Sequence, residues 1–379
     1  MRICLLLPSF VPNVGGLEKA ADKLACILNE WGHEPVVLTL ALGKNPVRVE
    51  RPYPIHFYRR PRSTTWWPRS LSVSLARCHR QYQFDLLWAY QAYPQGYAAV
   101  RVGTRLNIPV VISSRGGDIS HRSRYLARWL PGKRIQWALK RADAITTLNR
   151  HLSRRVEHLT AGLKQANMIF NGIDAPEENP VGRPAPQRIA SLDGKSFILS
   201  LTRLHKFKGI DLIIEALRIS RAKGTVTPLL VIAGNGSQRD MLLRQVSDGG
   251  LDERVCFVGE VSGYDKAWLL ANCQFLVQPS REGEGMPNSV LEAMSYGKPV
   301  LGTSAPGIEE IVTDGLNGIL AAPDDPKQLA EALDRILNSN LVELGKHAEQ
   351  FTSKHSWQII AGQYVALFKK VLRERAAQR

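Results

Sequence analysis

Residues 275–302 read FLVQPSREGEGMPNSVLEAMSYGKPVLG, and this stretch predicts a strand, a turn, a helix and a second strand. The first strand is Phe275–Gln278. The helix begins near Asn288 and ends at Gly297, and the second strand is Pro299–Gly302. Both strands are short apolar runs without alternation of polar residues. Such strands, joined through a helix, indicate a parallel sheet that is covered by helices on both faces.

The same alternation of apolar strands and amphipathic helices continues on both sides of this stretch, in two series. Each series predicts one α/β domain with a Rossmann-like parallel sheet. The first series consists of Arg2–Leu7, Val36–Leu40, Leu86–Tyr90, Val110–Ser113 and Ala144–Leu148, and the second of Phe197–Leu201, Leu229–Ala233, Val255–Val258, Phe275–Gln278 and Pro299–Gly302.

A linker separates the two series. Residues Ala175–Arg188, APEENPVGRPAPQR, contain four prolines, one glycine and no apolar periodicity. We therefore expect an N-terminal domain over residues 1–185, which includes the start of the linker, and a C-terminal domain over 186–356. A final helix over 357–379 is expected to pack back on the first domain.

Composition places the chain among globular proteins, with 44% hydrophobic and 22% charged residues. No apolar run approaches the ~20 residues of a membrane-spanning helix. The first strand ends at Pro8, too early for a secretory leader. The five cysteines form no CxxC pair, which disfavours a structural zinc site and suits a reducing, cytoplasmic location.

The positive charge is concentrated in the first half of the chain. Residues 1–180 contain 26 Lys+Arg and 12 Asp+Glu, a net charge of +14, and the remaining 24 and 22 leave +2 for residues 181–379. Such a field favours an anionic partner: an acidic membrane surface, a phosphorylated acceptor or nucleic acid. Nucleic acid is disfavoured because the sequence contains no recognised reader motif.

The turn after the strand Phe197–Leu201 has the sequence TRLHKFKGID and contains two cations, Arg203 and Lys208. Ligands of open parallel sheets bind outside the carboxyl ends of the strands. A guanidinium fork and a mobile ammonium suit a diphosphate there. An ordinary solvated charged loop is the alternative.

The turn before the helix of residues 275–302 contains Glu284, and Glu292 follows about one turn inside the helix. Each carboxylate can accept hydrogen bonds from vicinal sugar hydroxyls. With Asn288 or Ser289 as the helix cap, the N–H groups of Gly285–Ser289 form an anion-binding site. The alternative is an acidic loop followed by a surface helix.

Taken together, these segments resemble retaining glycosyltransferase family 4. EGMPNSVLEAM is similar to its E-x7-E signature, and TRLHKFKG to its R-L-x-x-x-K-G phosphate segment. The resemblance implies a GT-B fold, with two Rossmann-like domains facing across a cleft, and a retaining, metal-independent transferase that uses a nucleotide-diphosphate sugar. Further agreement, in the family's order, comes from Pro8–Glu18, ADAITTLNRH, FNGID, VIAGNGSQRD, FVGEV and APGIEEIVTDGLNG.

The resemblance assigns a role to each matching residue. Arg203 and Lys208 would bind the donor diphosphate and offset charge on the leaving group. Glu292 would hold the ribose hydroxyls, and Glu284 the donor sugar. The glycines at 15 and 16 would let the first-domain loop approach the diphosphate. Together with Gly15 and Gly16, the remaining nucleotide-sugar contacts would come from Gly234, Gly259, Glu260, Gly285, Met286, Pro287 and Asn288.

One position departs from the family. Many members have a His after the strand that corresponds to Val110–Ser113, and this chain has Arg115, followed by Asp118. These two residues are candidates for a catalytic role at a sugar hydroxyl, for contact with an acidic acceptor, or for a structural ion pair with each other.

Two segments combine cations with aromatic residues: Tyr58–Arg80 with Trp66 and Trp67, and His121–Asp143. The first segment is predicted to be mostly loop. The second is predicted to form two short helices that are separated at Pro131-Gly132. Interfacial segments of this kind dock on anionic lipid. In the alternative interpretation the apolar members of the second segment face the core: Leu126, Trp129, Leu130, Trp137 and Leu139.

The resulting hypothesis is a transferase for cell-envelope polysaccharide or glycoconjugate synthesis, acting at a glycan or lipid-linked acceptor, cytoplasmic or peripheral at the inner face of the membrane. The donor is expected to be UDP-linked, and no cofactor is expected, because the sequence has no Asp-x-Asp metal motif. A sugar-nucleotide epimerase, a phosphorylase and a non-catalytic scaffold protein of the same fold remain as alternatives. Hydride transfer is disfavoured because Pro8–Gly16 lacks the G-x-G-x-x-G fingerprint.

Overall fold

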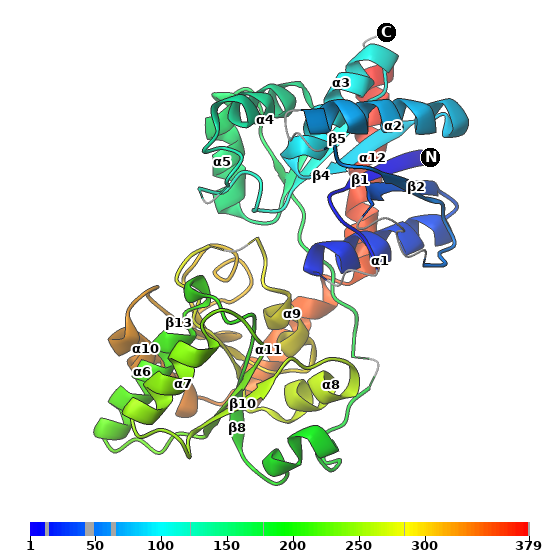
Figure 1. Ribbon diagram of the computed structural model, residues 1–379. Coiled ribbons are helices and arrows are strands. Elements are labelled where there is room, and N and C mark those ends of the chain that lie inside the picture. Colours follow the sequence, from blue (N-terminus) through cyan, green and yellow to red (C-terminus); the bar gives the residue numbers. More distant parts are fainter. Residues whose placement is uncertain are drawn as a thin grey trace. The chain divides into compact units, whose positions relative to one another are not determined.

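The computed structural model describes residues 1–379 except 12–14, 42–48, 62–65, 122, 177, 284 and 378–379. Contacts divide the chain into two compact units (Figure 1). Unit 1 consists of Met1–Gly172 and Trp357–Arg379, and unit 2 of Ile173–Ser356.

Unit 1 is built on a seven-stranded sheet with the order β3-β2-β1-β4-β5-β6-β7, in which every pair of neighbours is parallel. The strands β1 and β4 are buried almost throughout, which explains their continuous apolar sequences. The strands are β1 (Arg2–Leu7), β2 (Glu34–Leu40), β3 (Ile55–Tyr58), β4 (Leu86–Tyr90), β5 (Val110–Ser114), β6 (Ala144–Thr147) and β7 (Asn167–Met168).

Helices cover both faces of this sheet. Helices α1 and α12 lie together on one face, and α2 to α5 lie on the other (Figure 1). The helices are α1 (Gly16–Glu30), α2 (Trp67–Tyr82), the short turn η2 (Ala92–Gly96), α3 (Tyr97–Leu106), α4 (Trp129–Arg141), α5 (Arg150–Thr160) and α12 (Trp357–Ala377).

The C-terminal helix α12 belongs to unit 1, and aromatic packing attaches it there. The ring of Trp88 on β4 lies 4.6 Å from that of Tyr364 and 5.1 Å from that of Phe368, both on α12. The indole N–H of Trp88 donates a hydrogen bond to Ser113 at 2.8 Å, so its polar atom is satisfied inside the core.

Unit 2 has the same type of architecture, built on a six-stranded parallel sheet of order β10-β9-β8-β11-β12-β13. Helices α6, α7 and α10 cover one face, and α8, α9 and α11 the other (Figure 1). The strands are β8 (Phe197–Leu201), β9 (Leu229–Ala233), β10 (Val255–Gly259), β11 (Leu276–Gln278), β12 (Val300–Thr303) and β13 (Gly318–Ala321). The helices are η3 (Gln187–Leu192), η4 (Lys206–Lys208), α6 (Ile210–Ala222), α7 (Arg239–Asp248), α8 (Gly263–Asn272), α9 (Asn288–Ser295), α10 (Pro326–Leu337) and α11 (Leu341–Ser353).

The proline-rich linker packs on unit 2, so the division at Gly172/Ile173 falls before the boundary expected near residue 185. The indole of Trp268 on α8 donates to the carbonyl of Arg183 at 2.9 Å. The amide of Asn272 donates to the carbonyl of Pro180 at 3.4 Å.

Two expectations about the basic half were wrong. The segment after Tyr58 contains a full helix, α2, where a loop was expected. Helix α4 runs unbroken through Pro131 and Gly132. Proline is tolerated at the third residue of a helix because the N–H groups of the first turn have no intrahelical partner. Among the described residues, no helix combines the length and the apolar character needed to cross a bilayer.

Candidate functional site

The strand order of unit 2 reverses between the neighbouring strands β8 and β11. In doubly wound sheets, ligands bind at such a switch point, outside the carboxyl ends of the strands. The segment with Arg203 and Lys208 follows β8, and residues 279–287 follow β11. Both segments predicted to hold the diphosphate and the sugar therefore leave the sheet at its switch point.

The turns after β8 and β11 lie in direct contact. Gly209 has φ +67°, and a Cβ there would meet the carbonyl oxygen of Pro279 at 1.9 Å. The N–H of Arg281 donates to the carbonyl of Phe207 at 2.9 Å. Only glycine allows both the backbone conformation and the approach at position 209.

Arg281, which the sequence analysis did not single out, ties these two turns together. Its guanidinium donates to both carboxylate oxygens of Asp211, at 2.6 and 2.5 Å, and to the carbonyl of Lys206 at 3.0 Å. It also donates to Asp324 at 2.7 Å. The hydrogen bonds to Asp211 are the main cause that raises the pKa of Arg281 above its usual value. Arg281 therefore fixes the turn that contains Lys208.

The two cations of this turn differ in burial. Lys208 is 8% exposed, and its ammonium lies 5.5 Å from the ring centroid of Phe207. Arg203 is exposed. A positioned ammonium and an exposed guanidinium can each contact phosphate oxygens.

The turn after β9 contacts the segment that follows β8. Gly234 has φ +141°, and a Cβ there would meet the carbonyl oxygen of Thr202 at 1.9 Å. The N–H of Gly234 donates to the carbonyl of Gly259 at 2.7 Å, at the end of β10. Glu260 is exposed immediately beyond it. The exits of β8, β9 and β10 thus converge at Gly234 and Gly259, and a role of these glycines in nucleotide binding stays a prediction.

Helix α9 starts at Asn288 with Pro287 as its N-cap residue, in an extended conformation. The N-cap residue makes no side-chain capping hydrogen bond, and the cap expected at Asn288 or Ser289 was wrong because Pro287 holds that position. Proline favours this conformation, and the positive end of the helix dipole lies at this turn, where it favours an anion. The helix ends as expected, since Gly297 follows Tyr296 with φ +66°. Gly285 and Met286 precede the N-cap.

A buried polar network lies beneath this turn. The amide of Gln278 donates to Ser280 at 2.9 Å, and Thr303 donates to the carbonyl of Ser280 at 2.6 Å. All three side chains are fully buried. Such a satisfied network fixes the path of the chain as it leaves β11.

Glu292 on α9 forms an ion pair with Lys266 on α8, at 2.9 Å. Both side chains are about a quarter exposed, at 26% and 27%. No sequence signal pointed to Lys266, because the two residues come from different helices. The other predicted carboxylate, Glu284, lies outside the described residues.

In unit 1, the two predicted glycines form the start of α1. Gly15 is the N-cap residue and Gly16 the first helical residue. A Cβ at Gly15 would lie 2.3 Å from a carboxylate oxygen of Glu18, which accepts a hydrogen bond from the Ser9 hydroxyl. The part of the predicted phosphate loop at residues 12–14 lies outside the described residues.

Arg115 and Asp118 do not form the ion pair considered above. The guanidinium of Arg115 lies 4.8 Å from the ring centroid of Tyr90 and donates to the amide oxygen of Asn171. Arg115 is half-buried after β5, within reach of the exits of β4 and β5.

Asp118 is 1% exposed, and both of its carboxylate oxygens accept hydrogen bonds. One accepts from the N–H of Ala92 at 2.6 Å and the other from the Ser114 hydroxyl at 2.8 Å. Burial raises the pKa of Asp118, and these hydrogen bonds oppose the rise. Both carboxylate oxygens therefore bind groups inside unit 1, and a catalytic role of Asp118 stays a prediction.

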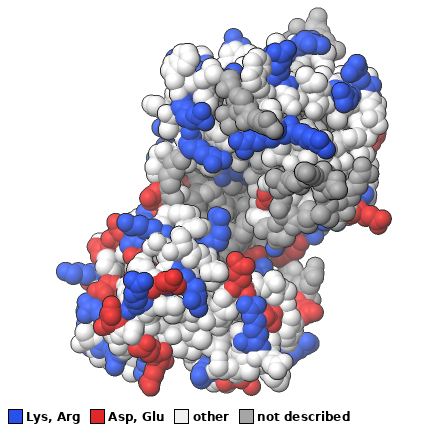
Figure 2. All heavy atoms as spheres, viewed as in Figure 1, with Lys and Arg blue, Asp and Glu red and all other residues white. Residues whose placement is uncertain are grey.

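The basic segments of unit 1 form a surface with exposed aromatic residues. Trp129 is 78% exposed and Trp66 is 55% exposed, so the alternative that Trp129 faces the core was wrong. Leu139 is fully buried, as that alternative expected. Figure 2 shows Lys and Arg side chains on unit 1 with little Asp or Glu beside them. Among the residues that the structure describes, no three His, Cys, Asp or Glu side chains are grouped to hold a metal ion.

Two family models match the chain, one in each half. The model "Glycosyl transferases group 1" matches residues 184–355. The model "Glycosyltransferase Family 4" matches residues 14–177. Between them they cover both units of the chain.

Relatives match over most of their length. The chain is 26% identical to an uncharacterised glycosyltransferase of Methanocaldococcus jannaschii, over 72% of each protein. It is 24% identical to the N-acetyl-alpha-D-glucosaminyl L-malate synthase of Bacillus anthracis, over 96% of each. Among solved structures, HepE of Anabaena in complex with UDP has a TM-score of 0.79 at 18% identity and covers 98% of this chain and 100% of its own. This likeness and the two parallel-sheet units confirm the expected GT-B fold.

Proposed function

Because the two family models together place this chain among the glycosyltransferases of group 1 and family 4, we propose that it transfers a sugar from a nucleotide-diphosphate donor to a glycan or lipid-linked acceptor. The observation that carries this proposal is the contact between the turns after β8 and β11. It groups Arg203, Lys208 and the start of α9 at the switch point of unit 2.

In this proposal the donor diphosphate lies between two sources of positive potential. One is the turn with Arg203 and Lys208, and the other is the N-terminus of α9. Glu292 holds the ribose hydroxyls while Lys266 orients its carboxylate. Glu284 and the backbone at Gly285 to Asn288 contact the donor sugar. A role of Gly15 and Gly16 in binding the phosphates stays a prediction from the family resemblance.

The chemistry we propose is transfer with retention. The acceptor hydroxyl attacks on the face from which the leaving group departs, and a departing phosphate oxygen accepts its proton. Arg203, Lys208 and the helix terminus stabilise the charge that develops on the diphosphate, and no metal ion is part of this scheme. Equal rates in excess Mg²⁺ and in excess chelator would support it, and loss of transfer with the chelator would contradict it.

For the donor we propose a UDP-sugar. HepE, whose fold this chain shares, has been solved with UDP and with UDP-glucose. A thermal-shift screen of UDP-, GDP- and ADP-sugars tests this choice, because a ligand that binds only the folded protein raises its apparent stability. A shift with GDP-sugars alone would overturn it.

For the acceptor we propose a growing lipid-linked or cell-envelope glycan, reached while unit 1 rests on an anionic membrane surface from the cytoplasmic side. The net charge of +14 over residues 1–180 supports this location, as do the exposed indoles of Trp66 and Trp129. Co-sedimentation with anionic vesicles and with neutral vesicles tests it, with binding expected only to the first.

The decisive experiment for the activity is Lys208→Ala, compared with Lys206→Ala. Both lysines lie in the same turn, but Lys206 is exposed while Lys208 is 8% exposed. Lys208→Ala is expected to lower transfer at least 100-fold, and Lys206→Ala less than threefold. Wild-type turnover of Lys208→Ala would refute the donor site. Nucleotide-sugar binding without transfer to any acceptor would favour a scaffold role, and sugar isomerisation without an acceptor would favour an epimerase.

A further inference from the structure

Two adjoining chambers lie on unit 1, between helices α2, α3 and α4. Helix α2 follows β3, α3 follows β4 and α4 follows β5. The chambers therefore lie among the segments that leave the carboxyl ends of these three strands. Their cavity volumes are about 60 and 240 Å³. Arg134 on α4 lines both. The two chambers therefore meet at Arg134, and together they are called the groove, with a smaller and a larger compartment.

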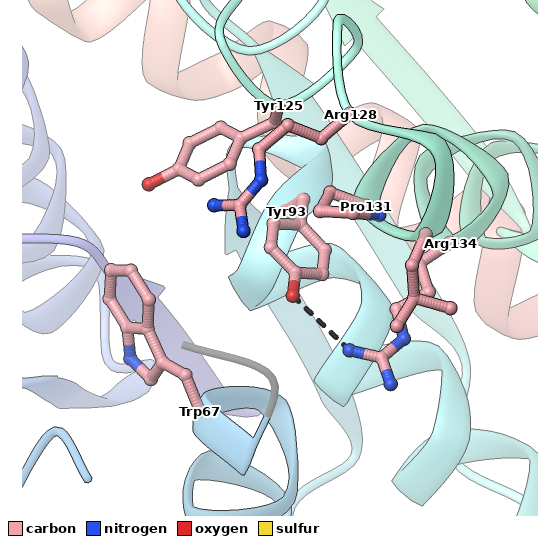
Figure 3. A pocket seen from close by; sticks show the side chains of 7 residues that line it. Trp67, Tyr93, Tyr125, Arg128, Pro131 and Arg134 are labelled. Carbon is pink, nitrogen blue, oxygen red and sulfur yellow. Dashed lines mark hydrogen bonds between the residues drawn. The ribbon is translucent and has the colours of Figure 1, made fainter. Parts of the chain in front are cut away.

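The smaller compartment is lined by three aromatic and two aliphatic side chains and by two arginines. Figure 3 shows Trp67, Tyr93 and Tyr125 around the same space as Arg128 and Arg134. The rings of Tyr93 and Tyr125 lie 5.3 Å apart, and the hydroxyl of Tyr93 accepts a hydrogen bond from Arg134 at 3.3 Å. Trp67 and Tyr93 are 6% and 2% exposed. These rigid apolar walls suit an apolar chain segment.

The larger compartment contains three arginines, Arg69, Arg101 and Arg134, together with Trp66 and Tyr97. Aromatic rings hold all three guanidinium groups. Arg69 lies 5.3 Å from the ring centroid of Trp66, and Arg101 and Arg134 lie 5.9 and 5.3 Å from that of Tyr97. Three guanidinium groups that line one space can contact the oxygens of a phosphate group.

Among the residues that the structure describes, no carboxylate lines either compartment. Between Glu50 and Asp143 the sequence contains 17 Lys+Arg and only two acidic residues, Asp85 and Asp118. Asp85 forms an ion pair with Arg2 at 2.7 Å, and Asp118 is buried with both oxygens bonded. The positive charge around the groove is therefore not offset by this region's own acidic residues, and an anion can neutralise it.

From this arrangement we infer that the groove binds a phosphate-bearing lipid, with the phosphate between Arg69, Arg101 and Arg134 and the first apolar segment against Trp67 and Tyr93. This inference rests on the proposed transfer, because it names the class of its acceptor. A soluble phosphorylated glycan is disfavoured, because its hydroxyl groups would lose hydrogen bonds to water against the apolar walls of the smaller compartment. The first turn of α4 also exposes Trp129 and Leu130, the second of which lines the groove, so an apolar chain leaving it meets further apolar surface.

The test compares three probes in calorimetric titrations: dodecyl phosphate below its micellar concentration, inorganic phosphate, and neutral dodecyl maltoside. Dodecyl phosphate is expected to bind at least tenfold more tightly than either of the others, because only it offers both the charge and the chain. Equal affinity for inorganic phosphate would overturn the inference in favour of a soluble phosphorylated ligand.

A matched pair of double variants assigns the binding to the groove. R69Q/R101Q changes one arginine on α2 and one on α3, and R77Q/R105Q changes two exposed arginines on the same helices outside the groove. Both lower the net charge equally. We expect R69Q/R101Q to weaken dodecyl phosphate binding at least tenfold and R77Q/R105Q less than twofold. Equal weakening would mean diffuse attraction and would refute a site.

Titrations of UDP and melting curves of the same proteins separate this inference from the proposed function. R69Q/R101Q is expected to melt like the wild type and to keep its UDP affinity. If Lys208→Ala leaves transfer unchanged, the proposed donor site fails while the groove is still judged by dodecyl phosphate. If R69Q/R101Q binds dodecyl phosphate as tightly as the wild type does, the proposed lipid site in the groove is refuted, and the proposed donor site is unaffected.

Discussion

Replacing Arg281 with lysine tests whether the donor site depends on the clamp between the turns after β8 and β11. The guanidinium makes four side-chain hydrogen bonds: two to Asp211, one to Asp324 and one to the carbonyl of Lys206. A lysine keeps the charge, but its single nitrogen can reproduce only about two of these contacts. The bond to Asp324 counts little because that carboxylate is 67% exposed.

The magnitude follows from the contacts that are lost. A hydrogen bond to a charged group contributes about 1.5–3 kcal/mol, so losing about one or two in this partly screened place removes roughly 2–3 kcal/mol from the positioning of the Lys206–Lys208 turn. A binding-competent turn that is populated less often lowers the apparent affinity in proportion. At about 1.4 kcal/mol per factor of ten, the donor affinity is expected to fall roughly 25- to 140-fold.

The assay is calorimetric titration of UDP and GDP into wild type, Arg281→Lys and Arg218→Lys. Arg218 is the matched control because its fork binds Glu215 at 2.9 and 2.6 Å on the exposed side of α6. The same substitution there is expected to cost under ~0.5 kcal/mol and to leave affinity within about twofold. If Arg281→Lys binds the nucleotide as tightly as Arg218→Lys, the clamp does not preorganise the site.

Three further predictions follow from other contacts. The coupling between Glu292→Gln and Lys266→Ala in a double-mutant cycle of nucleotide affinity is expected to be about 1 kcal/mol, and additive effects would show that the ion pair is irrelevant to binding. Phe368→Ala is expected to destabilise unit 1 by about 3–4 kcal/mol in urea unfolding, because it empties a fully buried ring position beside Trp88; an unchanged transition would mean that α12 does not stabilise this unit. Burial raises the pKa of Asp118, so the native state holds the proton more tightly, and the stability of wild type relative to Asp118→Asn should fall as the pH rises from about 4. A stability difference that does not change between pH 4 and 7 would contradict this assignment.

Several strands could be predicted from the sequence to the residue. The observed bounds of β1, β4, β8 and β9 are the expected ones. These strands are buried on both faces, so that hydrophobicity alone marks their length. Strand β3 was missed because only its last residue is buried and its sequence, IHFY, has no continuous apolar run. Strand β13, with the sequence GILA, was missed because it directly follows a turn-rich segment and begins with a glycine.

The components of the candidate site were predicted better than their connections. Arg203, Lys208 and the start of α9 follow strands that any parallel arrangement of unit 2 brings to one edge. Arg281 and its partner Asp211 are 70 residues apart, and Lys266 and Glu292 are 26 apart. Charged residues are common on surface turns, so their pairing has no signature in a single sequence.

The sequence by itself determined two parallel α/β units, the apolar strands that form them, and the cations and carboxylates that leave the strands of unit 2. Hydrophobic periodicity and turn residues are local properties, and each can be recognised from a few consecutive residues of the chain. The tertiary structure decided which of these side chains are available to a ligand. It buried Asp118, paired Glu292 with Lys266, exposed Trp129, and assembled the groove from α2, α3 and α4. Burial and pairing depend on which distant segments meet, and packing alone determines that.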